Sequence, residues 1–348
     1  MLAVKLVEPH RFEMQECPIP EPAEDEVLIK NMYLGICTSD VQIYQGKHAY
    51  ASMPVTMGHE ISGVIEKVGM KVTEWEKGDR VVVQPQLFCG KCPACRNGHF
   101  NVCEDLKVIG VHTDGCACEY VTVPAENLHT MPDSLTFREA ALAEPLAVGF
   151  GVVRRIREIM DIRGKRICIV GAGVIGNFVA QACRLYGAEQ VLITDVREER
   201  LCLAQYCGIN FIANTSKKPL AEVIEKYFGT DRADIIVDSA ATPAVFQSVL
   251  NAARSASVIV ISGNYKESVP FDVTRIQRRE ITLLGHMMYG QKEFDEALTC
   301  LSQKKIKLDG IITQEWNLNQ YPNAFHFLEQ YPEQVVKMVV RIGEDQQT

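Results

Sequence analysis

The stretch Ile167-Cys168-Ile169-Val170-Gly171-Ala172-Gly173-Val174-Ile175-Gly176 decides the fold of the second half of this 348-residue chain. An apolar run of strand length leads directly into a G-x-G-x-x-G motif, and a segment of helical period follows over residues 174–186. In this context the three glycines allow a tight turn, close approach of the backbone to a pyrophosphate, and close packing of helix on strand. The N-terminus of the helix would then face the negative charge, so the motif predicts a dinucleotide-binding turn.

The choice of dinucleotide depends on Asp195, which ends the next predicted strand. Its carboxylate would accept hydrogen bonds from the adenosine ribose and repel a 2′-phosphate, which favours NAD over NADP. Arg197 and Arg200 leave NADP open, because a guanidinium can accommodate that phosphate. We favour the interpretation that both arginines belong to a solvated helix start beside two glutamates. The predicted cofactor contacts are Gly171, Gly173, Val174, Ile175, Gly176, Asp195 and Arg200.

Short apolar runs alternate with segments of helical period throughout the second half of the chain, which predicts a parallel, doubly wound α/β sheet. The predicted strands cover residues 167–170, 190–194, 211–213, 235–238, 258–262 and 281–284, and the predicted helices cover 174–186, 198–207, 220–228 and 244–253.

The first half is rich in Val and Ile, with turn residues between short runs, and predicts an irregular antiparallel β domain. Its predicted strands cover residues 2–7, 27–33, 61–68, 80–84 and 119–123. Two helices at 293–303 and 323–331 and a strand at 335–340 are too little for a third domain, so we expect this tail to pack onto the first. The predicted domains are therefore 1–148 with 286–348, and 149–285.

Composition excludes several classes of function. Acidic residues outnumber basic residues by 44 to 36, and no long basic run could follow a phosphate backbone, so nucleic acid is not an expected partner. No signal sequence begins the chain and no run of about 18 apolar residues occurs, so we expect a cytoplasmic protein without a membrane partner.

Four of the thirteen cysteines, Cys89, Cys92, Cys95 and Cys103, form a C-x2-C-x2-C-x7-C pattern in a loop-like segment. Four thiolates this close can complete a closed tetrahedral shell around one zinc ion, which is the form of a structural site. An iron–sulfur cluster and reduced cysteines without a metal are the alternatives. The ferredoxin spacing and its following proline are absent, so zinc is favoured.

Several segments in order resemble the zinc-dependent medium-chain alcohol dehydrogenases over essentially the whole chain. These segments are Gly58-His59-Glu60 running into 61–69, Gly78-Asp79-Arg80-Val81, the four-cysteine segment, Glu144-Pro145-Leu146 and Val170-Gly171-Ala172-Gly173. The resemblance is closest to the polyol and sugar-acid branch, which includes the dehydrogenases of sorbitol, threonine, L-galactonate and L-gulonate; residues 108–115 look most like the last group. It implies a GroES-like β domain, a Rossmann domain, an active site in the cleft between them, and a homodimer or homotetramer.

The resemblance also implies a second, catalytic zinc. Its ligands would be Cys37 and His59, with Glu60 and Glu144 sharing the remaining positions directly or through water. Ser39 would relay the proton from the zinc-bound alcohol. Many relatives carry histidine as the next relay member, where this chain has Gln42, which cannot exchange protons near neutral pH. Water and ribose hydroxyls could complete the relay, or His48 could; we favour water.

The expected reaction is hydride transfer between NAD and a secondary alcohol of a polyol or sugar acid. A sugar acid needs a cation for its carboxylate, and we expect His112 and Arg279 to contact substrate, although Arg279 could equally belong to a surface Arg-Arg-Glu cluster. The first alternative is an alcohol-, sorbitol- or threonine-type dehydrogenase that acts on another small alcohol. Two further alternatives are a quinone-reductase-like NADPH enzyme and a non-catalytic zinc and nucleotide-binding protein. The retained cysteine segment and predicted ligands count against these last two.

Overall fold

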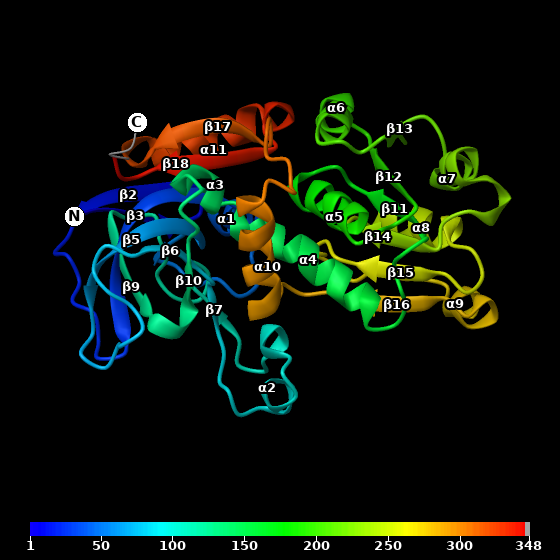
Figure 1. The fold of residues 1–348 in the computed structure, drawn as a ribbon. Coiled ribbons are helices and arrows are strands. Elements are labelled where there is room, and N and C mark those ends of the chain that lie inside the picture. The colour runs from blue at the N-terminus through cyan, green and yellow to red at the C-terminus, as the bar shows by residue number, and fades with distance from the viewer. Residues whose placement is uncertain (345–348) are drawn as a thin grey trace. The chain divides into compact units, whose positions relative to one another are not determined.

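The computed structural model describes residues 1–344, and the chain forms two compact units (Figure 1). Unit 1 comprises Met1–Glu144, Gly290–Gln303 and Ile312–Thr348, and unit 2 comprises Pro145–Tyr289 and Lys304–Ile311. The last segment differs from the predicted division. Gln181 explains the difference, because its side chain accepts from the Lys307 backbone N–H at 2.8 Å and donates to the Lys307 carbonyl at 3.1 Å.

The main sheet of unit 1 has the strand order β10-β6-β5-β3-β18-β17, with β9 also paired to β3. Its strands are β3 (Glu26–Ile36), β5 (Glu60–Val68), β6 (Arg80–Val83), β9 (Tyr120–Pro124), β10 (Leu128–Thr130), β17 (Ile312–Asn317) and β18 (Lys337–Arg341). Most residues of β3 are buried, so this central strand reads as a near-continuous apolar run. The pairing of β18 with β3 returns the end of the described chain to the first unit, as the sequence predicted.

Smaller elements complete unit 1. A second sheet has the order β2-β1-β4, and β7 pairs with β8. Neither β2 nor β17 was predicted, because both lack the apolar run used to recognise the other strands. The remaining elements are β1 (Leu2–Glu8), β2 (Arg11–Glu16), β4 (Val55–Thr56), β7 (Gln86–Leu87), β8 (Lys107–Val108), α1 (Thr38–Tyr44), α2 (Pro93–Arg96), α3 (Phe137–Ala140), α10 (Gln291–Ser302) and α11 (Tyr321–Gln330).

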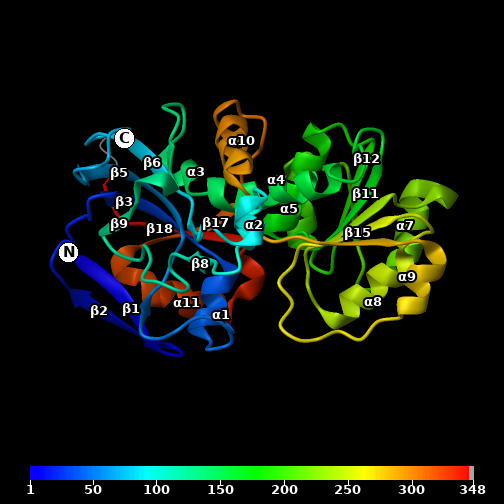
Figure 2. The same cartoon turned by 90° about the horizontal axis from the view of Figure 1, so that it is seen from below.

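Unit 2 is the predicted doubly wound domain, a parallel sheet in the order β13-β12-β11-β14-β15-β16. The strand order reverses between β11 and β14, and ligands of such sheets bind outside the carboxyl ends of the strands at this point. Figure 2 shows α4 and α5 on one face of the sheet and α8 and α9 on the other. The strands are β11 (Arg166–Val170), β12 (Gln190–Asp195), β13 (Phe211–Asn214), β14 (Ile235–Asp238), β15 (Val258–Ile261) and β16 (Thr282–Gly285), and the helices are α4 (Ala143–Arg157), α5 (Val174–Leu185), α6 (Glu198–Tyr206), α7 (Leu220–Phe228), α8 (Pro243–Ala252) and α9 (Val273–Arg279).

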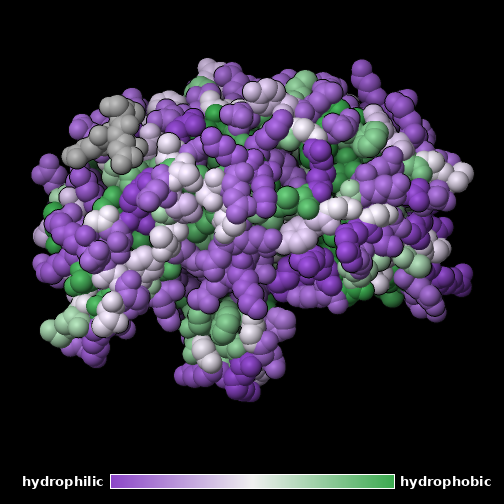
Figure 3. All heavy atoms as spheres, in the orientation of Figure 1, coloured by the Kyte–Doolittle hydropathy of each residue, from purple (hydrophilic) through white to green (hydrophobic). Residues whose placement is uncertain are grey.

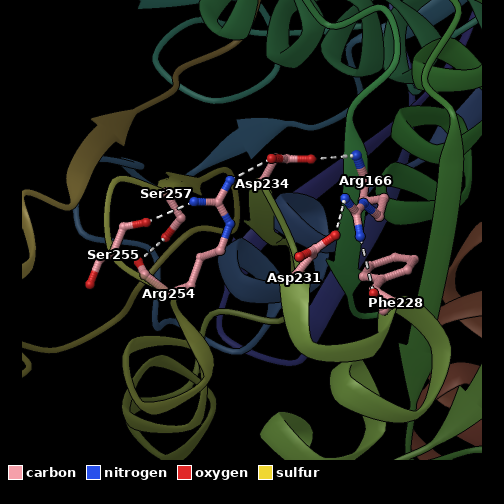
Figure 4. A network of polar contacts seen from close by, with 7 residues as sticks. All are labelled: Arg166, Phe228, Asp231, Asp234, Arg254, Ser255 and Ser257. Carbon is pink, nitrogen blue, oxygen red and sulfur yellow. Dashed lines mark hydrogen bonds and ion pairs between the residues drawn. The ribbon is translucent and has the colours of Figure 1, made fainter.

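A polar network connects the strands of this sheet at their amino ends (Figure 4). Asp234, just before β14, accepts from the Arg166 backbone N–H at 2.8 Å and from the Arg254 guanidinium. Arg166 also reaches Asp231 at 3.1 Å, and Ser257 donates to the Arg254 carbonyl at 2.7 Å. These bonds join the starts of β11, β14 and β15, which leaves the opposite, carboxyl edge for ligands.

Among the described residues, no helix combines the length and the apolar character needed to cross a membrane.

Candidate active site

Unit 1 brings together one thiol, one imidazole and one carboxylate from separate segments. Cys37 is the N-cap of α1, His59 directly precedes β5, and Glu60 begins that strand. One ligand atom from each lies within 4.8 Å of the others, and His59 and Glu60 are buried. Soft sulfur, imidazole nitrogen and carboxylate oxygen are the zinc ligands that proteins use, so the three fit this metal.

The imidazole of His59 is oriented by Asp40, which the sequence reading did not single out. Asp40 is completely buried, its Oδ1 lies 3.5 Å from His59 Nδ1, and its Oδ2 accepts from the Cys37 backbone N–H at 2.8 Å. A carboxylate behind the imidazole leaves Nε2 for the metal and raises the basicity of the ring. Asp40 therefore holds the Cys37 backbone by a hydrogen bond and places its carboxylate beside the His59 ring, to which no hydrogen bond joins it.

Glu60 has a buried cation beside it. Lys337 of β18 forms an ion pair with the Glu60 carboxylate and donates to the Ile36 carbonyl at 3.0 Å. Space for Glu60 depends on Gly35, where a Cβ would lie 2.0 Å from Glu60 Oε2. Glu60 thus has two competing partners, the buried ammonium and a metal beside Cys37 and His59.

The electrostatics of this group favour a cation. Burial lowers the pKa of His59, but Asp40, Cys37 and Glu144 outweigh it and raise that pKa well above its usual value. Burial likewise opposes protonation of Lys337, yet Glu60, Cys37 and Glu144 raise its pKa. The surroundings of the site are therefore strongly negative.

The other predicted members of this site, Glu144 and Ser39, do not belong to the group of three ligand residues. Glu144 is buried in the first turn of α4 and acts on the charges of His59 and Lys337, but it is not part of the tight ligand group. Ser39 lies in the first turn of α1, two residues after Cys37, and is partly exposed. Gln42 is buried in the same helix.

Two imidazoles flank Tyr50 on the same unit. The Tyr50 ring centre lies 6.3 Å from that of His48 and 6.4 Å from that of His112, and His112 Nδ1 accepts from the Val108 backbone N–H at 3.0 Å. Burial lowers the pKa of both histidines, and the charges of His112 and His59 lower that of His48 further. These shifts favour the neutral form of both rings, which can bond to hydroxyl groups.

The four-cysteine segment forms a second ligand group, with its sulfur atoms all within 4.8 Å of one another. Backbone N–H groups point at the sulfurs: Cys92 donates to Cys89 at 3.3 Å, Cys95 to Cys92 at 3.4 Å, and Asp105 to Cys103 at 3.4 Å. Hydrogen bonds of this kind stabilise thiolates, and those from the backbone of Glu104 and then of Cys95 lower the pKa of Cys92 to about 6. The predicted structural zinc fits this group.

This four-cysteine lobe has little hydrophobic core of its own. Phe88 and Phe100 pack on the cysteines with their rings 4.6 Å apart, while Val102 is half exposed. Figure 3 shows apolar atoms at the surface of this lobe, which contains α2 in Figure 1. A segment with so few buried side chains depends on its metal for stability.

In unit 2 the glycine loop has the geometry of a dinucleotide cradle. A Cβ at Gly176 would lie 1.8 Å from the Gly171 carbonyl oxygen, whereas one at Gly173 would meet nothing within 4 Å. Gly173 is the N-cap of α5 and provides no side-chain cap, so the first N–H groups of the helix face open space. An anionic pyrophosphate fits there.

Asp195 braces this loop. Its Oδ2 accepts from the Ala172 backbone N–H at 2.7 Å and its Oδ1 from those of Val196 and Arg197, at 2.8 and 3.0 Å. Arg200 lies 3.8 Å from the carboxylate. A carboxylate has about four acceptor positions, so Asp195 can still accept from ribose hydroxyls.

Arg279 lies just before β16, where the sequence places it. It ends α9 at the amino edge of β16. Its guanidinium donates to the Ala253 carbonyl at 3.3 Å, and its backbone carbonyl accepts from the Ala256 backbone N–H at 2.8 Å. Ligands of a parallel sheet bind at the opposite edge. The position of Arg279 in unit 2 therefore argues against a substrate contact.

Comparisons with known proteins identify the family of this chain. The alcohol dehydrogenase GroES-like domain matches residues 23–133, and the zinc-binding dehydrogenase domain matches residues 174–303. The chain belongs to the zinc-dependent medium-chain alcohol dehydrogenases, so the predicted family, fold class and enzyme class are confirmed. Zinc and a nicotinamide dinucleotide fit the family and the sites of this chain, in agreement with the predicted cofactor classes.

Three relatives cover nearly the whole chain. The 2-dehydro-3-deoxy-L-galactonate 5-dehydrogenase of Pseudoalteromonas atlantica is 31% identical, over 99% of this chain and 100% of its own. The sorbitol dehydrogenase of Bacillus subtilis is 29% identical, over 98% of this chain and 97% of its own. The structure of an alcohol dehydrogenase (rspB) of Escherichia coli CFT073 with NADH matches with a TM-score of 0.91 at 30% identity. The match covers 98% of this chain and 99% of that one.

Proposed function

We propose that this enzyme oxidises a secondary alcohol of a polyol or sugar acid, such as L-gulonate or L-galactonate, with NAD. The observation that carries the proposal is the convergence of Cys37, His59 and Glu60. A closed structural site has four protein ligands, whereas a catalytic zinc site has three and one open position. The group of Cys37, His59 and Glu60 offers three protein ligands, as a catalytic zinc site does.

Zinc bound there would supply a Lewis acid, which would lower the pKa of a substrate alcohol towards neutrality. Cys37 and His59 hold the metal, and Asp40 keeps His59 oriented through the 3.5 Å contact at Nδ1. Glu60 binds at the metal or withdraws to Lys337. Ser39, next to these ligands, accepts the alcohol proton and passes it to water, because Gln42 cannot carry it further.

The loop from Gly171 to Gly176 would hold the dinucleotide, with the start of α5 available for its pyrophosphate and Asp195 for its adenosine ribose. NAD held there would supply the acceptor for a hydride from the substrate carbon. We also place Arg200 beside the ribose, because it lies 3.8 Å from Asp195. The carboxylate that braces the loop also disfavours a 2′-phosphate.

The substrate class rests on the relatives and on the two neutral imidazoles. One relative of nearly full length acts on a deoxy sugar acid and another on sorbitol. His48 and His112 can bond to substrate hydroxyls while neutral, and a carboxylate would bind best when His112 is protonated. We assign His112, rather than Arg279, to substrate recognition.

A panel of sorbitol, L-gulonate, L-galactonate and L-threonine, each with NAD and NADP, tests the proposal. We expect turnover with NAD of a polyol or sugar acid, loss of turnover after chelation, and recovery with added zinc. Enzyme that carries two zinc ions per chain and turns over none of these alcohols would favour the non-catalytic alternative. Faster turnover with NADP would contradict the role given to Asp195.

The resemblance also leads us to propose a homodimer or homotetramer. Within the described residues β16 is an edge strand of the unit 2 sheet, and an edge strand can pair with another chain. Light scattering after size-exclusion chromatography would give the mass directly, and a mass near 39 kDa would contradict this proposal.

A further inference from the structure

A buried carboxylate lies at the carboxyl edge of the unit 2 sheet. Asp238, the last residue of β14, has no exposed surface. Its Oδ1 accepts from the backbone N–H groups of Ala240 and Ala241, at 3.0 Å each, and its Oδ2 accepts from the Tyr265 hydroxyl. Hydrogen bonds to a buried charge are strong, and losing one leaves the charge undersatisfied.

These bonds fix a tight turn over residues 239–241. Ala241 has a φ of +53°, which an L-residue holds only when its surroundings enforce it. A Cβ at Gly263 would lie 2.6 Å from the Ala241 Cβ, so the segment after β15 packs directly on the turn. On the other side, a Cβ at Gly171 would lie 3.2 Å from the Ala240 nitrogen. The turn is therefore held between the glycine loop and the segment that carries Tyr265.

The turn lies beside the point where the strand order reverses. Ser239 donates through its backbone N–H to the Val170 carbonyl at 2.9 Å, joining the ends of β14 and β11 (Figure 1). The Ser239 hydroxyl is buried and has no hydrogen-bond partner in the structure. An unsatisfied hydroxyl next to the phosphate-binding loop is a group that a bound dinucleotide can satisfy.

We propose that Tyr265 is a positioning residue for the dinucleotide: its hydroxyl holds Asp238, and Asp238 holds the 239–241 turn against Gly171. The proposal rests on dinucleotide binding at the glycine loop. Tyr265 acts through Asp238, to which its hydroxyl donates. Burial, followed by the bond to Asp238, raises the pKa of Tyr265, so the phenol remains a donor at neutral pH.

Tyr265→Phe in the zinc-loaded enzyme tests the proposal, because it removes one oxygen and keeps the ring. We expect about tenfold weaker NADH binding by fluorescence titration, the lower range for one bond to a charged group. KM for NAD should rise in parallel, while kcat and the KM for the alcohol at saturating NAD stay within about twofold. The matched control is Tyr227→Phe, whose hydroxyl donates to the Ile212 carbonyl at 2.7 Å in the same unit. This control should bind NADH as the unsubstituted enzyme does.

A second measurement separates positioning from general stability. In an Asp238→Asn background, Tyr265→Phe should weaken NADH binding much less, because the two residues act on the same turn and their effects do not add. NADH binding by Tyr265→Phe within about twofold of the unsubstituted enzyme, with only a lower unfolding temperature, would overturn the proposal. Equal weakening in Tyr227→Phe would also overturn it. Failure of dinucleotide binding in the unsubstituted enzyme would instead refute the proposed function.

Discussion

Asp40→Asn should weaken the binding of the catalytic zinc without disturbing the fold. Asparagine keeps an oxygen for the Cys37 backbone N–H, which Asp40 Oδ2 accepts at 2.8 Å. Asparagine has no negative charge. In the unsubstituted enzyme the Asp40 carboxylate, 3.5 Å from His59 Nδ1, raises the pKa of His59 and makes the imidazole a better ligand. Removal of such a carboxylate costs about 10- to 100-fold in metal affinity or activity. That range corresponds to about 1.4–2.8 kcal/mol.

The assay is competition for zinc against a chromophoric chelator, with zinc counted per chain and kcat/KM measured on the same samples. The four-cysteine lobe should keep its ion, so only one of two zinc ions per chain should become easier to remove. Asp133→Asn is the matched control, since Asp133 is fully exposed in the same unit and lies 3.8 Å from Arg80. Zinc affinity in Asp40→Asn within about twofold of this control would refute the assigned role of Asp40.

The other predictions concern buried charges. Lys337→Met should lower the free energy of unfolding of the zinc-free enzyme in urea by about 3–5 kcal/mol, because it leaves buried Glu60 without its cation. Lys67→Met, which breaks an exposed pair, should cost at most about 1 kcal/mol, and equal costs would contradict the assignment. Burial lowers the pKa of His286 to about 4, so the unfolded chain binds more protons between pH 6.5 and 4, and stability falls as the pH drops through this range. His286→Asn should remove about 3 kcal/mol of that fall in urea unfolding, and an unchanged pH dependence would argue against a neutral, buried His286.

The most predictable parts of this protein are encoded in short stretches of sequence. The glycine loop and the four-cysteine segment each place all their chemistry within a few residues, so spacing alone identifies them. The alternation of strands and helices in the second half follows in the same way. Helix α4 was missed, although Glu144 and Pro145 open it as a helix start would.

Contacts between distant segments could not be predicted in this way. Cys37 and His59 come from separate segments, and only the family resemblance paired them. Lys337 reaches the Ile36 carbonyl across 301 residues. Its one local signal was a charged side chain inside the apolar strand 335–340, which is rare unless that charge is paired. The sequence also left Arg279 open between a substrate contact and a surface cluster, since proximity to a strand does not tell which edge of the sheet a side chain occupies.

The most direct test of the central claim is the zinc content and turnover of Cys37→Ser, compared with Cys202→Ser, which changes an exposed thiol of unit 2. We predict two zinc ions per chain and full activity in Cys202→Ser. Cys37→Ser should hold one zinc ion, retained by the four-cysteine lobe, should still bind NADH, and should lack alcohol oxidation. Two zinc ions per chain with normal turnover in Cys37→Ser would contradict the claim that Cys37, His59 and Glu60 form the catalytic metal site.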